Sequence, residues 1–175
     1  MKQKYTNVKR VYYDIETGQQ SSERLTKHQT CFDSLSEFRI YKLLCEYFQS
    51  DRFDIVVHPT VRIANTDWRI DFAIEAKLED WNAQLTLANI INSLHNTNYT
   101  TFQRIYVEFK GLQDDNFIRQ MKNVAINSPL FGNTVILVSD KSSAFGCWDS
   151  VRKRFYCHPI VATSLFEDVL KLQEF

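Results

Sequence analysis

The chain has 175 residues, 44% of them hydrophobic and 24% charged, a composition typical of one globular domain with a substantial core. Lysine plus arginine equals aspartate plus glutamate at 21 each, so the formal net charge is zero. This balance excludes polyanion binding through bulk basicity, and any such site must be a local patch. No apolar run approaches the ~18 residues of a membrane span, and no N-terminal stretch resembles a signal peptide.

The cysteines and histidines show none of the common metal-site spacings. None of the four cysteines forms a C-x-x-C pair, and the four histidines form neither H-x-H nor H-E-x-x-H. Reduced thiols are therefore expected. These features together predict a soluble, cytoplasmic protein with no membrane partner.

The N-terminal part of the chain contains the clearest helix signal. A strand is predicted within 8–15, followed by a loop at 18–22. Over 33–49, apolar residues recur every three or four positions and predict one buried helical stripe: Leu35, Phe38, Tyr41, Leu44 and Phe48. Ser34 and Glu37 have the spacing of a capping box at the start of this helix.

Two strands are predicted next. The first covers 53–61 and ends around His58 and Pro59. The second covers 67–76 and alternates between two faces. One face carries Trp68, Ile70, Phe72 and Ile74, and the other carries Arg69, Asp71 and Ala73.

Helices and strands alternate through the rest of the chain. A helix is predicted over 79–95 from four apolar residues at helical spacing: Trp81, Leu85, Ala88 and Ile91. The next predicted elements are a polar turn, a strand, a helix and a strand, at 96–101, 104–110, 114–126 and 133–139. Ser164 opens a last helix with a capping box to Glu167. This alternation predicts an α/β fold in which helices flank a mixed sheet.

The strand at 104–110 ends in a charged pair. Residues i and i+2 of a strand point the same way, so Glu108 and Lys110 should project together and Phe109 to the opposite side. A carboxylate can hold a hard cation, and a neighbouring amine can position or deprotonate water. This pairing is typical of metal-dependent phosphodiester cleavage.

Four residues form an ordered set with that pair. They are Glu37, Asp71, Glu108 and Lys110. Their setting resembles the PD-(D/E)XK nuclease superfamily, which has an acidic residue in an early helix, an aspartate on a strand and E-x-K on the next core strand. The segment 32–38 (FDSLSEF) is similar to the helix motif of phage-type and transposon-type members. The segment 68–72 (WRIDF) supplies the aspartate, and 107–111 (VEFKG) supplies E-x-K.

The resemblance implies a restriction-endonuclease-like fold in a single domain over 1–175. Its core would cover about 30–140, with a C-terminal extension at 141–175. The chain departs from the family in two respects. Ile70 stands where the family often has proline, and 36 residues, 72 to 107, separate Asp71 from Glu108. The long gap predicts a helical insertion, within 79–101, between the two active-site strands.

The resemblance also implies a metal site. Asp71, Glu108 and the backbone carbonyl of Phe109 would ligate Mg²⁺ or Mn²⁺. Glu37 would hold a second ion or a metal-bound water, and Lys110 would orient or deprotonate the attacking water. Gln120, in the helix after E-x-K, stands where some members keep a supporting polar residue.

Other interpretations of these residues remain open at this stage. Glu75 and Lys77 form a second E-x-K, for which Asp67 is the candidate aspartate, although Glu75 shares the predicted strand of Asp71. The structural alternatives are a simple helix cap for Glu37, a salt bridge from Asp71 to Lys110 or Arg69, and a solvent-facing pair of Glu108 with Lys110.

We expect a Mg²⁺-dependent endodeoxyribonuclease of phage or mobile-element type, with DNA as its partner, acting as a homodimer or in a larger nucleic-acid-processing complex. The alternative is a non-catalytic or partner-dependent subunit of such a complex, and a third hypothesis is an enzyme acting on RNA. Two basic clusters are candidate DNA-binding surfaces. The first contains Lys2, Lys4, Lys9 and Arg10, and the second contains Arg152, Lys153 and Arg154 near Trp148, Phe155 and Tyr156.

Overall fold

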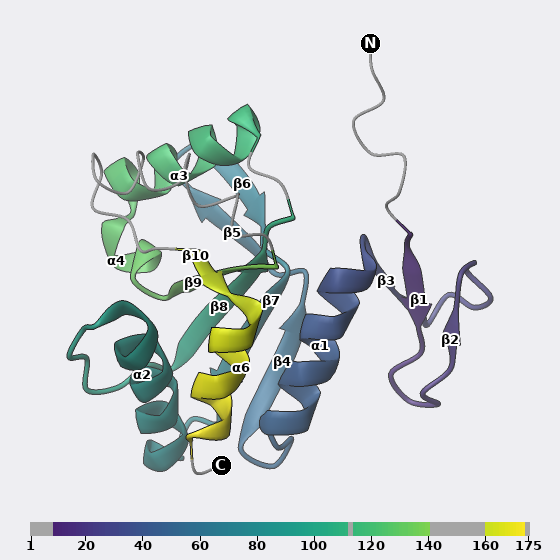
Figure 1. Ribbon diagram of the computed structural model, residues 1–175, viewed down its shortest axis with the longest axis horizontal. Helices are drawn as coiled ribbons and strands as arrows, with labels where there is room; N and C mark the ends of the chain where they lie inside the picture. Colours follow the sequence, from purple (N-terminus) through teal and green to yellow (C-terminus); the bar gives the residue numbers. More distant parts are fainter. Residues whose placement is uncertain (1–8, 112–113, 141–159, 174–175) are drawn as a thin grey trace. The chain divides into compact units, whose positions relative to one another are not determined.

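The computed structural model describes residues 9–111, 114–140 and 160–173 (Figure 1). The chain divides into two compact units, Met1–Leu43 and Leu44–Phe175. The boundary falls inside one continuous helix, α1 (Leu35–Tyr47). Whether the chain behaves as a single domain stays a prediction.

The first unit contains a small antiparallel sheet in the order β2-β1-β3. Its strands are β1 (Val11–Tyr13), β2 (Gln20–Ser21) and β3 (Thr30–Phe32). The sequence predicted a longer first strand, and it placed a loop where β2 lies. The first strand ends at Tyr13 because a tight turn begins at Asp14. The Asp14 carboxylate accepts hydrogen bonds from the backbone N–H groups of Glu16 and Thr17 at 3.1 and 3.0 Å.

The predicted stripe of α1 is largely confirmed. Phe38, Tyr41, Leu44 and Phe48 are buried, whereas Leu35 in the first turn is 41% exposed. Within the first unit, the rings of Phe38 and Tyr41 pack against Phe32, with centroids 5.2 and 5.0 Å away. These contacts join the helix to the small sheet.

The second unit is built on a five-stranded mixed sheet in the order β10-β9-β8-β7-β4. Its strands are β4 (Phe53–Val57), β7 (Phe72–Ala76), β8 (Arg104–Phe109), β9 (Val135–Ser139) and β10 (Ile160–Ala162). The β4, β7 and β8 strands run antiparallel, whereas β8, β9 and β10 run parallel. The predicted mixed α/β class is confirmed, although β10 was not predicted.

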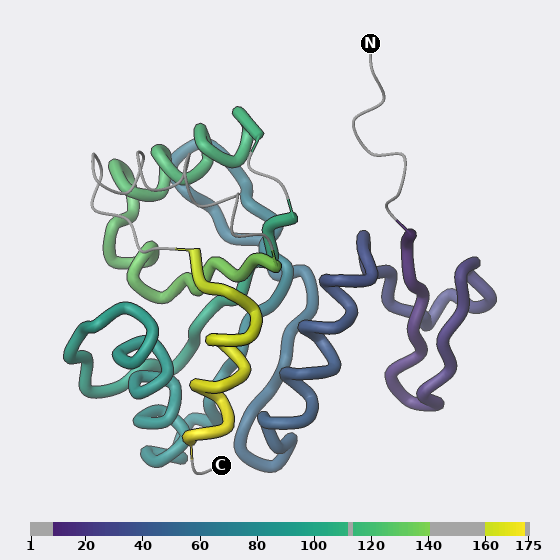
Figure 2. The backbone as a smooth tube through the Cα atoms, viewed as in Figure 1, coloured from purple at the N-terminus to yellow at the C-terminus, as the bar shows by residue number. Residues whose placement is uncertain are grey.

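Helices connect and cover these strands. The helix α2 (Trp81–His95) lies between β7 and β8 in the chain and packs against α6 (Thr163–Lys171) over the sheet. Figure 2 shows the backbone leaving β7, forming α2 and returning as the neighbouring strand β8. The predicted helix between two adjacent strands is therefore present. The parallel strands β8 and β9 are joined through α3 (Asp115–Asn127) and the short α4 (Pro129–Gly132).

The predicted strand at 67–76 is wrong as a single element. It is two strands, β6 (Thr66–Arg69), which pairs with β5 (Thr60–Ile63), and β7. Pairing continues across the break, because the His58 N–H donates to Asp71 O at 2.8 Å and the Ile70 N–H donates to Pro59 O at 2.9 Å. His58 has φ 55° at this break, a kink beyond which β5 and β6 form a separate two-stranded sheet.

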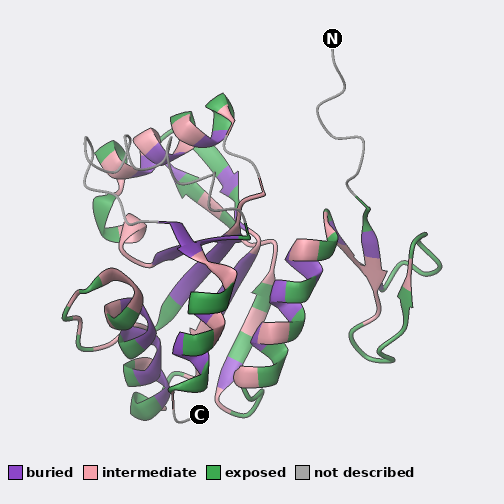
Figure 3. Cartoon of the chain, in the orientation of Figure 1, coloured by how far each residue is buried: buried purple, intermediate pink, exposed green. Residues whose placement is uncertain are grey.

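Two helix predictions also need correction. On α2 the buried residues are Ala83, Thr86, Leu87, Ala88, Ile90 and Ile91. Trp81 and Leu85, predicted on the inner face, are 64% and 39% exposed, and Figure 3 shows exposed as well as buried positions along α2. The predicted capping box of Ser164 is absent, because α6 begins at Thr163 without a side-chain cap and Glu167 instead pairs with Lys171 at 2.7 Å.

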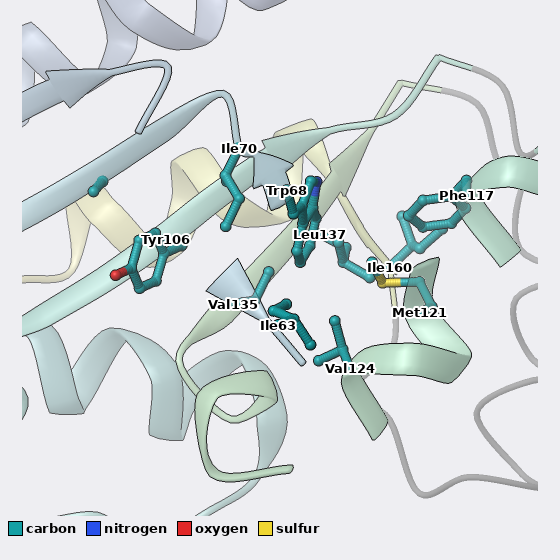
Figure 4. Packing of buried hydrophobic residues seen from close by; sticks show 11 residues of the cluster. Ile63, Trp68, Ile70, Tyr106, Phe117, Met121, Val124, Val135, Leu137 and Ile160 are labelled. Carbon is teal, nitrogen blue, oxygen red and sulfur yellow. The ribbon is translucent and has the colours of Figure 1, made fainter. Parts of the chain in front are cut away.

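A cluster of buried side chains packs where the β5–β6 hairpin and α3 meet the sheet (Figure 4). It contains Ile63 and Trp68 from the hairpin, Phe117, Met121 and Val124 from α3, and Tyr106 and Leu137 from the sheet. Because Tyr106, Glu108 and Lys110 alternate onto the same side of the chain, this packing brings α3 close to the end of β8.

No helix among the described residues combines the length and apolar character that crossing a bilayer requires. Cys31 and Cys45 are free thiols. Of the proposed basic surfaces, Lys9 and Arg10 are described and exposed. Lys2, Lys4 and the cluster 152–154 with its aromatic neighbours lie outside the described residues, so both surfaces stay predictions.

Candidate active site

The register of β7 and β8 brings two predicted carboxylates together. Phe72 pairs with Val107 in this antiparallel ladder. The residue before Phe72, Asp71, therefore lies opposite the residue after Val107, Glu108. Asp71 lies one residue before β7 rather than on the strand, at the kink described above. This corrects the predicted position of Asp71 but preserves its proximity to Glu108.

Each carboxylate accepts a hydrogen bond from the other strand. The Asp71 N–H donates to Glu108 Oε2 at 3.0 Å, and the Phe109 N–H donates to Asp71 Oδ2 at 2.7 Å. These reciprocal bonds hold two acidic side chains at one end of the strand pair. Two neighbouring carboxylates repel each other, so an arrangement of this kind is stabilised by a positive charge.

Lys110 supplies such a charge. Its Nζ lies 2.5 Å from Glu108 Oε1, which confirms that the two side chains share one side of the strand. The Glu108 side chain is only 3% exposed, whereas that of Lys110 is 26% exposed. Burial alone would lower the pKa of Lys110, but the charge and hydrogen bond of Glu108, with the charges of Asp71 and Asp114, outweigh it and raise that pKa. Lys110 is therefore held as an ammonium.

The start of α3 completes the surroundings of Lys110. Asp114 caps the helix by accepting the Phe117 N–H at 2.9 Å, and the Phe117 ring centroid lies 5.2 Å from Lys110 Nζ. Sequence reasoning assigned neither residue to the site. The available signal was their position four and seven residues after the E-x-K lysine, at the beginning of the next helix.

Glu37 belongs to the other unit, so it is described separately. It is buried, its N–H donates to Ser34 Oγ at 3.0 Å, and its Oε2 accepts the Asp33 N–H at 2.8 Å. This is a variant of the predicted capping box, since the glutamate reaches the residue before the cap. The capping role of Glu37 is confirmed, and its metal role stays a prediction.

Gln120 lies one turn along α3 from Phe117. Its Nε2 is buried and has no hydrogen-bond partner among the described residues. A buried amide donor of this kind usually has a partner. The role of Gln120 as a supporting polar residue of the site stays a prediction.

The alternative E-x-K set is not brought together. Glu75 pairs with Arg104 at 2.7 Å, Lys77 pairs with Asp54 at 2.5 Å, and Asp67 pairs with Arg62 at 2.8 Å. The three residues thus have three separate partners on exposed or half-exposed surface. The structure therefore favours Asp71, Glu108 and Lys110 as the candidate site.

The donor chemistry of this site suits a hard divalent cation. Asp71 and Glu108 offer carboxylate oxygens, and Phe109 adds a backbone carbonyl; Mg²⁺ binds through one or two carboxylates and keeps several waters. Among the described residues no group of three or more histidine, cysteine, aspartate or glutamate side chains is arranged to hold a metal ion. The fit therefore rests on two carboxylates and main-chain oxygen.

Comparisons with protein-family models, with curated proteins and with solved structures find no match. Fold and site together define a mixed α/β protein with a carboxylate–carboxylate–lysine site at the end of two antiparallel strands.

Proposed function

We propose that this protein is a metal-dependent endodeoxyribonuclease with a PD-(D/E)XK-type site. The observation that carries the proposal is the assembly of Asp71, Glu108 and Lys110, through two hydrogen bonds and one ion pair. Asp71 and Glu108 are 37 positions apart in the sequence, so local structure alone gives them no such geometry. An acidic pair with a lysine is the arrangement that the resemblance requires.

The architecture agrees with a restriction-endonuclease-like fold, which we include in the proposal. The two strands that carry the site are neighbours in a mixed sheet, and α2 and α6 pack against that sheet. The long gap between Asp71 and Glu108 is occupied by α2, so it does not separate the two residues in space. Ile70, at the position of the family proline, uses its N–H in a bond to Pro59 O, which a proline could not make.

In this proposal Asp71, Glu108 and the Phe109 carbonyl would hold Mg²⁺ or Mn²⁺. When bound, such an ion stabilises negative charge on phosphate oxygens and lowers the pKa of a coordinated water. Lys110, whose Nζ lies 2.5 Å from Glu108 Oε1, would orient or deprotonate the attacking water. The bond from the Phe109 N–H to Asp71 keeps that carboxylate aligned.

A partner-dependent subunit is the second candidate. The exposed apolar residues at α2 favour it, because Leu78 and Trp81 are 83% and 64% exposed. A protein surface of this kind is suited to contact another chain. In that case metal binding would occur without cleavage by the isolated protein.

The deciding experiment is a cleavage assay with Mg²⁺ or Mn²⁺ on linear, supercoiled, single-stranded and branched DNA, with RNA alongside. Lys110→Ala is the test variant, and Lys77→Ala is its matched control from the other E-x-K. Metal-dependent cleavage that is lost only in Lys110→Ala supports the nuclease. Equal cleavage by both variants would reject the site, and metal binding without any cleavage would favour the subunit.

A further inference from the structure

The helix that follows the candidate site has two chemically distinct faces. One face is buried through Phe117, Met121 and Val124, whose side chains enter the cluster in Figure 4. The other face carries asparagines at 116, 123 and 127, with Arg119 beside them. Asn116, Arg119 and Asn127 are exposed, and Asn123 is half-buried.

The three asparagines form a row along α3. At 3.6 residues per turn their spacings of seven and four place them within about 40° around the helix axis. Asparagine is a weaker helix former than alanine, lysine or glutamate, because it competes for backbone hydrogen bonds. Helix stability therefore gives no reason for three of them in one row, of which two are exposed and one is half-buried.

Hydrogen bonds between neighbours hold this row in order. Arg119 Nη2 donates to Asn116 Oδ1 at 2.8 Å, and Asn127 Nδ2 donates to Asn123 Oδ1 at 2.6 Å. Each pair joins residues three or four apart, which are neighbours on a helix surface. The amide and guanidinium groups consequently stand together as oriented donors and acceptors.

The row begins next to the candidate site. Asn116 adjoins Phe117, whose ring centroid lies 5.2 Å from Lys110 Nζ. Asparagine pairs with adenine, and arginine with guanine, in the major groove of duplex DNA, which admits an α-helix. From Asn116 to Asn127 the helix advances roughly 17 Å, the rise of about five base pairs.

We propose that α3 reads base edges in the major groove of duplex DNA through Asn116, Arg119, Asn123 and Asn127. This inference rests on the proposed function, since it makes duplex DNA the substrate and places its recognition beside the cutting site. Asp115, exposed in the first turn, disfavours a phosphate at that end. The phosphate contacts of the helix then come from its flank, at Lys122.

The test compares Asn116→Ala/Asn123→Ala/Asn127→Ala with Asn82→Ala/Asn89→Ala. The control removes exposed asparagines from α2, away from the row. Duplexes with a randomised segment are cut by each protein with Mg²⁺, and the ends are sequenced; bound duplexes are also recovered in Ca²⁺ and sequenced. Alanine favours the helix, so circular dichroism should show a folded triple variant.

The triple variant should lose the base preference of the wild type, by roughly 5- to 100-fold at each read position. Single variants should act in order, Asn116 on bases nearest the cut and Asn127 on those farthest away. Unchanged preference, or binding confined to single strands, would overturn the inference while cleavage upheld the nuclease. Preference that depends on the row without any cleavage would support DNA reading by α3 and reject the nuclease.

Discussion

Two neighbouring strands of the sheet end in the same tripeptide pattern, E-x-K, at 75–77 and 108–110. At 75–77 the two charged side chains turn to different partners, Arg104 and Asp54, and the lysine is 41% exposed. At 108–110 they pair with each other, and the glutamate is 3% exposed. The tripeptide alone therefore does not make a site, because the partners of its two charged side chains depend on the neighbouring strands and on the depth of burial.

Burial explains why the two pairs should differ in function as well. An exposed ion pair is screened by water and contributes about 0–1 kcal/mol. A buried carboxylate is costly unless it is paired and hydrogen-bonded, and Glu108 has both Lys110 and the Asp71 N–H. The charges of Glu108 and Lys110 are therefore screened less by water than those of the exposed pairs at 75–77.

The strongest predicted change is in the rate of DNA cleavage. Glu108→Gln should lower DNA cleavage by roughly 10²–10⁴-fold, because it removes a proposed metal ligand and the charge beside Lys110. Glu75→Gln should leave cleavage within a factor of about two, as expected for a surface pair. Initial rates at saturating Mg²⁺ measure both. Equal losses in the two variants would remove the functional distinction between the tripeptides.

The second prediction concerns the kink that places Asp71. Ile70→Pro should cost about 2–4 kcal/mol, because it removes the N–H bond to Pro59 O and the fully buried isoleucine side chain. Urea unfolding followed by circular dichroism measures the change. Ile70→Val is the matched control and should cost about 0.5–1.5 kcal/mol. A stable Ile70→Pro variant would contradict the described kink.

The third prediction compares the two lysines as structural groups. Lys110→Ala should destabilise the protein by about 1–3 kcal/mol, since it leaves the buried Glu108 without its cation. Lys77→Ala should change stability by less than about 0.5 kcal/mol. Glu108→Gln/Lys110→Met should recover much of the lost stability but none of the activity. Recovery of cleavage in this double variant would show that the pair acts only structurally.

The smallest effect concerns an ion pair outside the site, Arg52 with Asp80 at 2.9 Å. The hydrogen bond from Arg52, with the cap bond from the Ala83 N–H, lowers the pKa of Asp80 below its ordinary value of 3.8. The charged form therefore adds stability above about pH 3.8, and this is lost as pH falls through the lowered pKa. Melting curves of wild type and Asp80→Asn should differ at neutral pH and converge in strong acid; curves that stay parallel would contradict this assignment.

The local elements were largely predictable from sequence periodicity. The stripe of α1, the apolar strand of β8 and the N-terminal start of α3 depend on residues close together in the chain, so their signals are local. The break between β6 and β7 and the outward position of Trp81 were not predictable in this way. They depend on pairing with Pro59 and on which face of α2 meets the sheet.

The candidate site also combines features that are local in the sequence with features that depend on long-range contacts. That Glu108 and Lys110 share one side of a strand follows from the sequence alone, because side chains alternate along an extended backbone. The resemblance assigned Asp71 to this pair, but its contact with Glu108 comes from the tertiary structure, because the register of β7 against β8 is set by long-range pairing and burial. The alternative set of Asp67, Glu75 and Lys77 is left with separate partners. The spacing of the asparagines in the sequence likewise predicts a row on one helix. The position of that row near Lys110 depends on the packing of Phe117 in the buried cluster.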